Sequence, residues 1–200
     1  MKGLKEYITL NESEVGSLRP TNRDELMSLI IQRIKEQGSK CDLNDIDVSR
    51  VDDMSWLFSS HGLDKFDGDI SEWDVSNVRY MNSMFTDSQF NGDISKWDVR
   101  NVTNMSAMFV NSKFNGDISK WDVSNVQDMS EMFANSKFNG DISKWDVSNV
   151  QYMSEMFANS KFNGDVSKWD VRRVANMRDM FYKSPLSPLK GKAPRWYKES

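Results

Sequence analysis

Apolar residues recur along this chain with a fixed period of about 24 positions. A period of roughly 20 to 50 residues is typical of repeat proteins, in which each unit buries its apolar side chains against its neighbours. The pattern therefore predicts a solenoid. A phenylalanine opens each copy and a tryptophan lies seven positions later, in the pairs Phe66 and Trp73, Phe90 and Trp97, Phe114 and Trp121, Phe138 and Trp145, and Phe162 and Trp169.

Within a unit, residues 70–75 have the spacing apolar-x-x-apolar-x-apolar, which is the strand signature of leucine-rich repeats with tryptophan in a leucine position. Residues 78–85 place apolar side chains three and four positions apart, which favours a turn and one short helical segment. We therefore predict an α/β solenoid of the leucine-rich-repeat type. It would have about six coils of roughly 24 residues, a parallel sheet on one face and an N-terminal helical cap.

The first helix is expected over residues 22–37. Thr21 or Asn22 can cap its start and Gly38 follows its last turn. Its apolar stripe would cover the open end of the first coil. The expected organisation is a tail or short helix at 1–20, the helical cap at 21–41, a repeat solenoid at 42–183 with units 42–65, 66–89, 90–113, 114–137, 138–161 and 162–183, and a C-terminal cap or basic tail at 184–200.

Composition narrows the class of protein. Hydrophobic residues make up 38% of the chain and recur in register, which argues against disorder. A net charge of -4 argues against a nucleic-acid partner, although residues 172–200 alone carry about +6. No apolar run is long enough to cross a membrane, and the start has no secretory signal, so a cytoplasmic location is expected.

Candidate catalytic chemistry is sparse. Cys41 is the single cysteine and His61 the single histidine, so a Ser-His-Asp or Cys-His arrangement would have to use His61. His61 lies in a Ser-Ser-His-Gly loop, where a surface histidine is the simpler interpretation. We expect no enzyme activity, no catalytic residue and no cofactor.

The repeats turn single polar residues into ladders. The tryptophan ladder is expected in the core, and the asparagine ladder (Asn77, Asn101, Asn125, Asn149) is expected to bond buried amides to neighbouring coils. Two aspartate ladders start at Asp69 and Asp74 and suggest a calcium alternative, because stacked carboxylates can ligate a hard cation. Asn-Gly-Asp is also ordinary turn chemistry, and a lysine accompanies most copies, so no metal site is assigned.

A family resemblance rests on residues 138–150, FNGDISKWDVSNV, and on MSEMF at residues 153–157. These segments resemble the BspA-like leucine-rich-repeat proteins, whose repeats read W-D-x-S-x-V-x-x-M-x-x-M-F. The resemblance covers residues 42–182. It implies a leucine-rich-repeat-like solenoid and, as in many relatives, a cell-surface role in adhesion or protein binding.

Binding residues are sought where copies differ while the scaffold repeats. The function expected is that of a non-enzymatic, monomeric scaffold that binds an unidentified protein through an extended surface. The alternative is a structural or adhesive component of a cell surface or virion. The candidate binding residues are Arg79, Tyr80, Ser83, Asn104, Gln127, Asp128, Glu131, Gln151, Tyr152 and Glu155.

Overall fold

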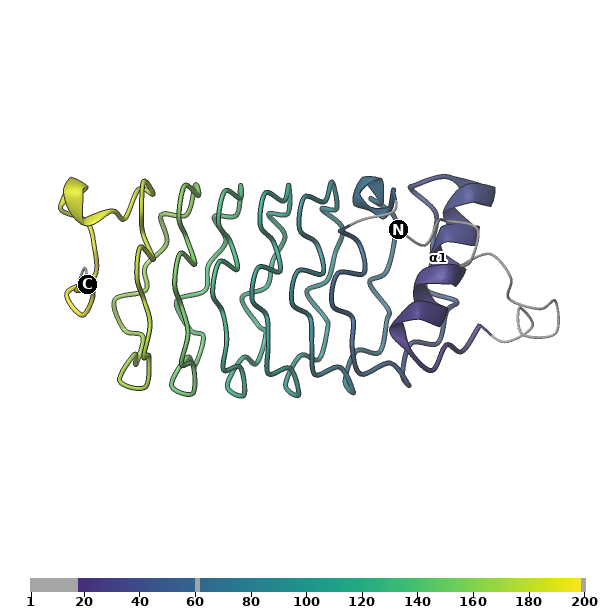
Figure 1. Ribbon diagram of the computed structural model, residues 1–200, viewed down its shortest axis with the longest axis horizontal. Helices are drawn as coiled ribbons and strands as arrows, with labels where there is room; N and C mark the ends of the chain where they lie inside the picture. Colours follow the sequence, from purple (N-terminus) through teal and green to yellow (C-terminus); the bar gives the residue numbers. More distant parts are fainter. Residues whose placement is uncertain (1–17, 60–61, 199–200) are drawn as a thin grey trace, which may run out of the picture.

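The computed structural model describes residues 18–59 and 62–198, which form one stack of coils (Figure 1). Helix α1 (Arg23–Gln37) lies at one end of the stack and the C-terminal segment lies at the other. Within the described residues, the other helices are the short 3₁₀ elements η2 (Leu63–Lys65) and η3 (Pro188–Lys190). Most of the predicted segment 1–20, and His61, lie outside the described residues.

The helix predicted over residues 22–37 is confirmed. The Asn22 side chain accepts the backbone N–H of Glu25 at 3.0 Å, which satisfies one of the free donors at the start of α1. At the other end, the N–H of Gly38 donates to the Ile34 carbonyl at 2.8 Å, with φ at 87°. Leu26 and Ile30 are fully buried and belong to the same core as the coils.

The predicted α/β solenoid with a parallel sheet is wrong. Across residues 18–59 and 62–198, coils are joined by isolated parallel bridges and no sheet forms. The main series of bridges lies outside the predicted strands and follows the positions of Asp53, Tyr80, Asn104, Asp128, Tyr152 and Asn176.

Local turns explain why residues 70–75 are not a strand. The N–H of Trp73 donates back to the Ile70 carbonyl at 3.3 Å, so this donor is not available to a neighbouring coil. The Asp69 side chain accepts the N–H of Ser71 at 2.9 Å. Aspartate and serine commonly bond nearby backbone groups in this way, which competes with strand pairing.

The short helical segment predicted in each unit is also absent, because hydrogen bonds alternate between two directions. Met81 N–H donates to the Asn104 carbonyl of the next coil at 3.0 Å, whereas Met84 N–H donates back to Met81 at 3.2 Å. Along this segment, odd residues bond the next coil and even residues close turns. The backbone N–H groups thereby find acceptors without forming an α-helix or a β-strand.

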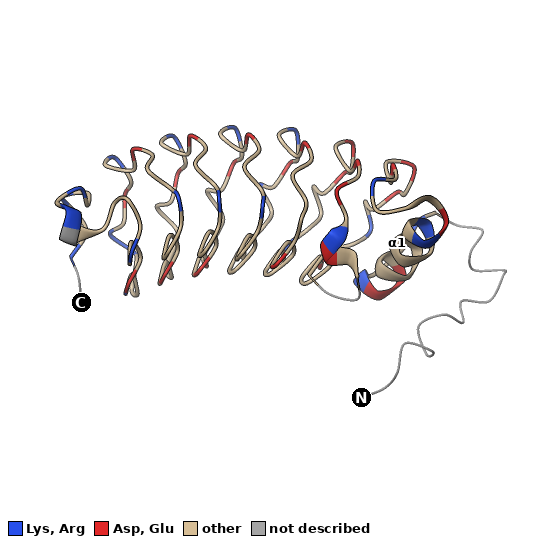
Figure 2. Ribbon diagram, turned by 90° about the horizontal axis from the view of Figure 1, so that it is seen from above, with Lys and Arg blue, Asp and Glu red and all other residues tan. Residues whose placement is uncertain are grey.

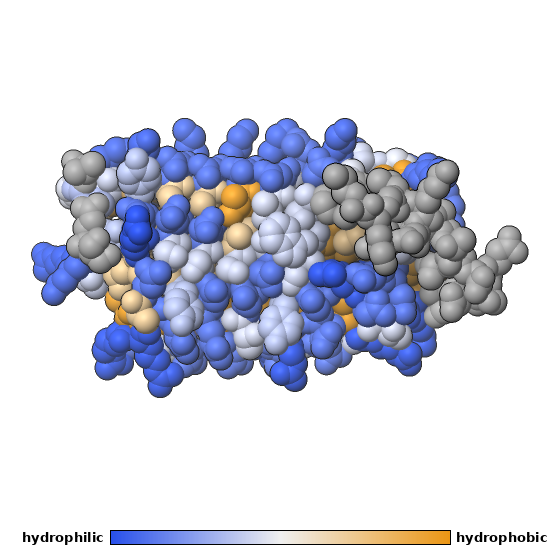
Figure 3. Space-filling view, viewed as in Figure 1, coloured by the Kyte–Doolittle hydropathy of each residue, from blue (hydrophilic) through white to orange (hydrophobic). Residues whose placement is uncertain are grey.

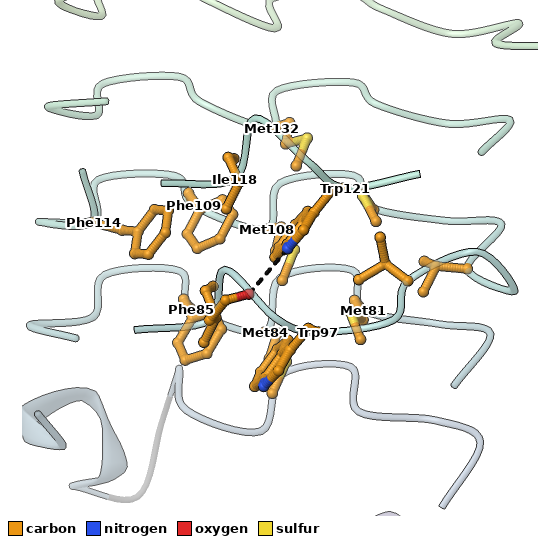
Figure 4. Close-up of a cluster of buried hydrophobic side chains, with 14 of the residues drawn as sticks. Met81, Met84, Phe85, Trp97, Met108, Phe109, Phe114, Ile118, Trp121 and Met132 are labelled. Atoms are coloured by element: carbon orange, nitrogen blue, oxygen red, sulfur yellow. Dashed lines mark hydrogen bonds between the residues drawn. The ribbon is translucent and has the colours of Figure 1, made fainter. Parts of the chain in front are cut away.

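Stacked aromatic rings fill the space between coils, and Figure 4 shows several of them around Phe109. The tryptophan ladder is buried as predicted, with Trp97 and Trp121 each 4% exposed and their rings 6.5 Å apart. Each indole N–H also donates to a carbonyl of the preceding coil. For Trp121 the acceptor is the Ile94 carbonyl at 3.0 Å, the bond drawn in Figure 4. Tryptophan here therefore joins coils as well as filling the core.

The last coil is covered by the C-terminal segment. Trp196 donates its indole N–H to the Val166 carbonyl at 3.1 Å and so continues the tryptophan ladder by one step. The Tyr197 ring packs edge-on against Phe181 with centroids 5.1 Å apart. These contacts agree with the expectation that residues near the C-terminus cover the final coil.

Candidate binding surface

One surface of the stack is built from the segments that carry the main series of bridges and the alternating turns. We call it the turn face and define it by residues 52–59, 79–87, 103–111, 127–135, 151–159 and 175–183. Figure 3 shows one side of the molecule, which is mostly hydrophilic with small apolar areas between polar side chains. No broad apolar patch covers the visible part of that side.

A left-handed backbone position shapes every copy of the turn face. Outside glycine, positive φ angles are uncommon, and β-branched residues adopt them least readily. Here the φ angles lie between 54° and 62°, although none of the residues is glycine. The turn therefore tolerates varied side chains at one repeated place, which holds Trp56, Ser83, Ala107, Glu131, Glu155 and Asp179.

The turn face carries all four large apolar side chains that are exposed in the described part of the chain. Trp56 is 51% exposed, Tyr80 and Tyr152 are each 45% exposed, and Tyr182 is 47% exposed. Aromatic residues are enriched at the centres of protein interfaces because they supply much contact area at little entropic cost. Their confinement to one surface distinguishes it from the rest of the stack.

The structure places nine of the ten predicted binding residues on at least partly accessible parts of the turn face. Ser83 is buried, with 4% exposure, and is removed from the candidate surface. Asn104 and Asp128 are half-buried, and each accepts a backbone N–H two residues later, so both also support turns. The exposed remainder are Arg79, Tyr80, Gln127, Glu131, Gln151, Tyr152 and Glu155.

Sequence reasoning missed Trp56 and Tyr182. Trp56 occupies the place of Ser83 in the degenerate first repeat, so aligning that repeat with the next would have identified it. Tyr182 occupies the place of Thr86 and Val110, which are half-buried, and of Ala134 and Ala158, which are buried, so the repeat pattern does not mark that position as exposed.

The side chains of the asparagine ladder bond neighbouring coils to each other. Asn101 donates its side-chain amide to the Ser76 carbonyl of the preceding coil at 2.7 Å, and Asn125 bonds Arg100 in the same way. The predicted bonding between coils is confirmed, but both side chains are exposed and not buried. At the last coil, the Arg173 guanidinium donates to the side chain of Asn149.

The first aspartate ladder caps turns. The Asp93 and Asp117 carboxylates each accept the backbone N–H of the serine two residues later at 2.9 Å. These N–H groups are the main reason that the pKa of each carboxyl lies below its ordinary value. In the described residues, no group of three or more His, Cys, Asp or Glu side chains could hold a metal ion. The carboxylates that the calcium alternative would use are thus engaged by the backbone.

Acid is expected to destabilise the stack through this ladder. A carboxyl whose pKa is lowered on folding stabilises the fold above its unfolded pKa, and that stabilisation is lost as the pH falls through the folded value. The melting temperature should therefore be steady near neutral pH and fall below about pH 4. Thermal unfolding followed by circular dichroism between pH 7 and pH 2 measures this.

Asp117→Asn is the matched control for the acid prediction. An asparagine can keep the turn, because Asn104 already accepts the Ser106 N–H at 2.8 Å in the same geometry. The substitution removes one titrating carboxyl but keeps an oxygen that accepts the serine N–H. The melting temperature should therefore fall less steeply at low pH. If the melting temperature of this variant falls with pH as steeply as that of the intact protein, the aspartate ladder is not the cause of the acid sensitivity.

The single cysteine, Cys41, lies in the core. Cys41 is buried, and desolvation raises the pKa of its thiol, which disfavours the reactive thiolate. Its carbonyl, by contrast, has a structural use and accepts the N–H of Asp69 at 3.1 Å.

Comparison with known proteins identifies a family for this chain. A family model described as "Mycoplasma protein of unknown function, DUF285" matches residues 26–137 and 89–192. No curated protein and no solved structure matches the chain. Among the described residues, no helix combines the length and the apolar character that crossing a membrane requires.

Proposed function

The chain belongs to the DUF285 family, which is related to the BspA-like repeat proteins, and on that premise we propose that it is a non-enzymatic module that binds another protein through its turn face. The family has no established function, so the proposal depends on the surface of this chain. The observation that carries it is the confinement of the exposed aromatic side chains to one surface.

The contrast between repeated positions that hold the coils together and exposed positions that vary supports the proposal. Trp97, Asn101 and Asp93 recur in equivalent copies and each bonds the scaffold, so they hold the coils together. Several turn-face positions vary from coil to coil and are exposed, as at Arg79 and Gln127. A fixed scaffold with a variable outer surface suits recognition of one particular partner.

The proposal assigns no catalysis to the chain. Repeated polar side chains occur in equivalent surroundings, whereas acid–base chemistry uses two groups whose environments push their pKa values apart. A turnover abolished by alanine substitution of one residue would contradict this part of the proposal.

Affinity capture from the source cells tests the binding surface. The Tyr80→Ala, Tyr152→Ala double variant should lose a partner that the intact protein retains, because interface tyrosines often contribute about 2 kcal/mol each. A Lys96→Ala, Lys144→Ala variant is the matched control, since both lysines are exposed and lie outside the turn face. Its bound proteins should equal those of the intact chain.

Two further outcomes decide between the proposed functions. Tyr80→Phe, Tyr152→Phe should restore much of the binding, because it restores the rings. If the intact protein and both alanine variants recover the same background proteins, the binding proposal fails. The structural or adhesive alternative would then be favoured.

A further inference from the structure

Within each turn-face segment between residues 79 and 159, a row of four alternate N–H groups donates to the next coil. At one interface, the N–H groups of Met153 and Glu155 donate to carbonyls of the next coil at 2.8 and 2.9 Å. The N–H groups of Phe157 and Asn159 continue the row at 2.9 and 2.7 Å. In this row the donors lie on the coil nearer the N-terminus and the acceptors on the next coil, whereas Gln151 and Tyr152, at the start of the segment, donate back to the Gln127 carbonyl at 2.8 and 3.3 Å.

The last coil consequently ends in a row of unused donors. The equivalent N–H groups belong to Met177, Asp179, Phe181 and Lys183, and none has an acceptor within residues 18–59 and 62–198. The side chains of the C-terminal segment cover the apolar core, but no described carbonyl of that segment bonds this row. Unpaired donors at every second residue are the edge to which another chain can add.

The surroundings of this edge are basic. Residues 172–200 contain eight Lys and Arg against two acidic residues, a net charge of +6, so the remainder of the -4 chain carries -10. Figure 2 shows several of these basic residues around the C-terminal end. Beside the row, the Arg178 side chain is 75% exposed and pairs with the Asp179 carboxylate at 3.1 Å, and the Lys183 ammonium lies 5.0 Å from the centre of the Tyr182 ring. Unpaired N–H groups add partial positive charge at the same edge.

We propose that this C-terminal edge binds an acidic, extended segment of a partner protein. Alternate carbonyls of the segment accept the N–H groups of Met177, Asp179, Phe181 and Lys183, as the carbonyls of the last coil do for the coil before it. Carboxylates of the segment lie against the surrounding Lys and Arg side chains. This site goes beyond the proposed function, because it uses backbone donors at the end of the stack and does not use Tyr80 or Tyr152.

A designed peptide provides the probe. Fluorescence anisotropy would compare a labelled octapeptide of alternating glutamate and valine with one of alternating glutamine and valine. The intact protein should bind the glutamate peptide more tightly, and added salt should reduce the difference. Arg178→Gln, Lys183→Gln should reduce it as well.

The backbone contribution is tested with a matched pair of substitutions at Met177. Both Met177→Pro and Met177→Ala remove the half-buried side chain, but only proline also removes the N–H. That N–H bonds nothing in the described structure, and the preceding Asn176 lies in a bridge, the extended conformation that a following proline favours. Met177→Pro should bind the glutamate peptide about fivefold more weakly than Met177→Ala.

Several results would overturn the proposal. These are absence of binding, equal affinity for the two peptides, or equal affinity of the two folded Met177 variants. Self-association of the intact protein in sedimentation, abolished by Met177→Pro, would assign the edge to a second copy and also overturn it. Tyr80→Ala, Tyr152→Ala should bind the peptide normally, which separates this site from the turn-face proposal.

Discussion

Replacing Phe109 with alanine is expected to lower the free energy of unfolding by about 3–5 kcal/mol. Phe109 is fully buried, and its ring stacks on Phe85, Phe114 and Phe133 with centroids 5.6, 4.5 and 5.7 Å apart. The lost ring would leave a cavity that touches three coils at once. Urea unfolding followed by circular dichroism gives the change in free energy.

An exposed aromatic residue is the control for Phe109→Ala. Tyr80→Ala removes a ring of similar size from the surface and should change the free energy of unfolding by less than about 0.5 kcal/mol. Comparable losses in the two variants would contradict the assignment of Phe109 to the core and of Tyr80 to a binding surface.

Replacing Trp121 with phenylalanine is expected to cost about 2–3 kcal/mol. The smaller ring keeps much of the apolar contact but has no N–H for the Ile94 carbonyl, which lies 3.0 Å from the indole nitrogen. A buried acceptor without a donor is the larger part of the expected loss. The same urea unfolding experiment measures it.

Trp196→Phe provides the comparison for Trp121→Phe. Trp196 makes the equivalent bond to the Val166 carbonyl at 3.1 Å, but it is only half-buried at the end of the stack. Water can replace the lost donor there, so the cost should be smaller. Equal losses at Trp121 and Trp196 would show that the indole bond contributes little and that ring volume dominates.

The periodic apolar pattern predicted the core correctly, because repeated side chains must meet repeated side chains. It assigned the tryptophan ladder, with Trp97 and Trp121, to the interior, and both are buried. Helix α1 was predictable because Asn22, Gly38 and the apolar stripe agree on its bounds. The strands could not be predicted correctly, because the spacing of apolar residues reports which side chains are buried. It does not report which acceptors the backbone N–H groups bond. At residues 70–75, the turn at Trp73 and the Asp69 cap take those groups.

The candidate surface was predicted in part. Variable positions marked Tyr80 and Tyr152 as outward-facing, since a scaffold position cannot vary freely, and both are exposed. The same logic failed for Ser83, which varies among copies yet is buried. The same left-handed turn position is buried at Ser83 and 51% exposed at Trp56, so variation among copies does not by itself report exposure.

The near identity of the coils has a consequence for how such a chain can change in size. Coils 90–113 and 114–137 present nearly the same contacts to their neighbours, so either could be omitted or copied while the ends stay unaltered. Each added copy would lengthen the stack by about 5 Å. The length of the stack thus depends on the number of coils and can change without altering the residues at either end.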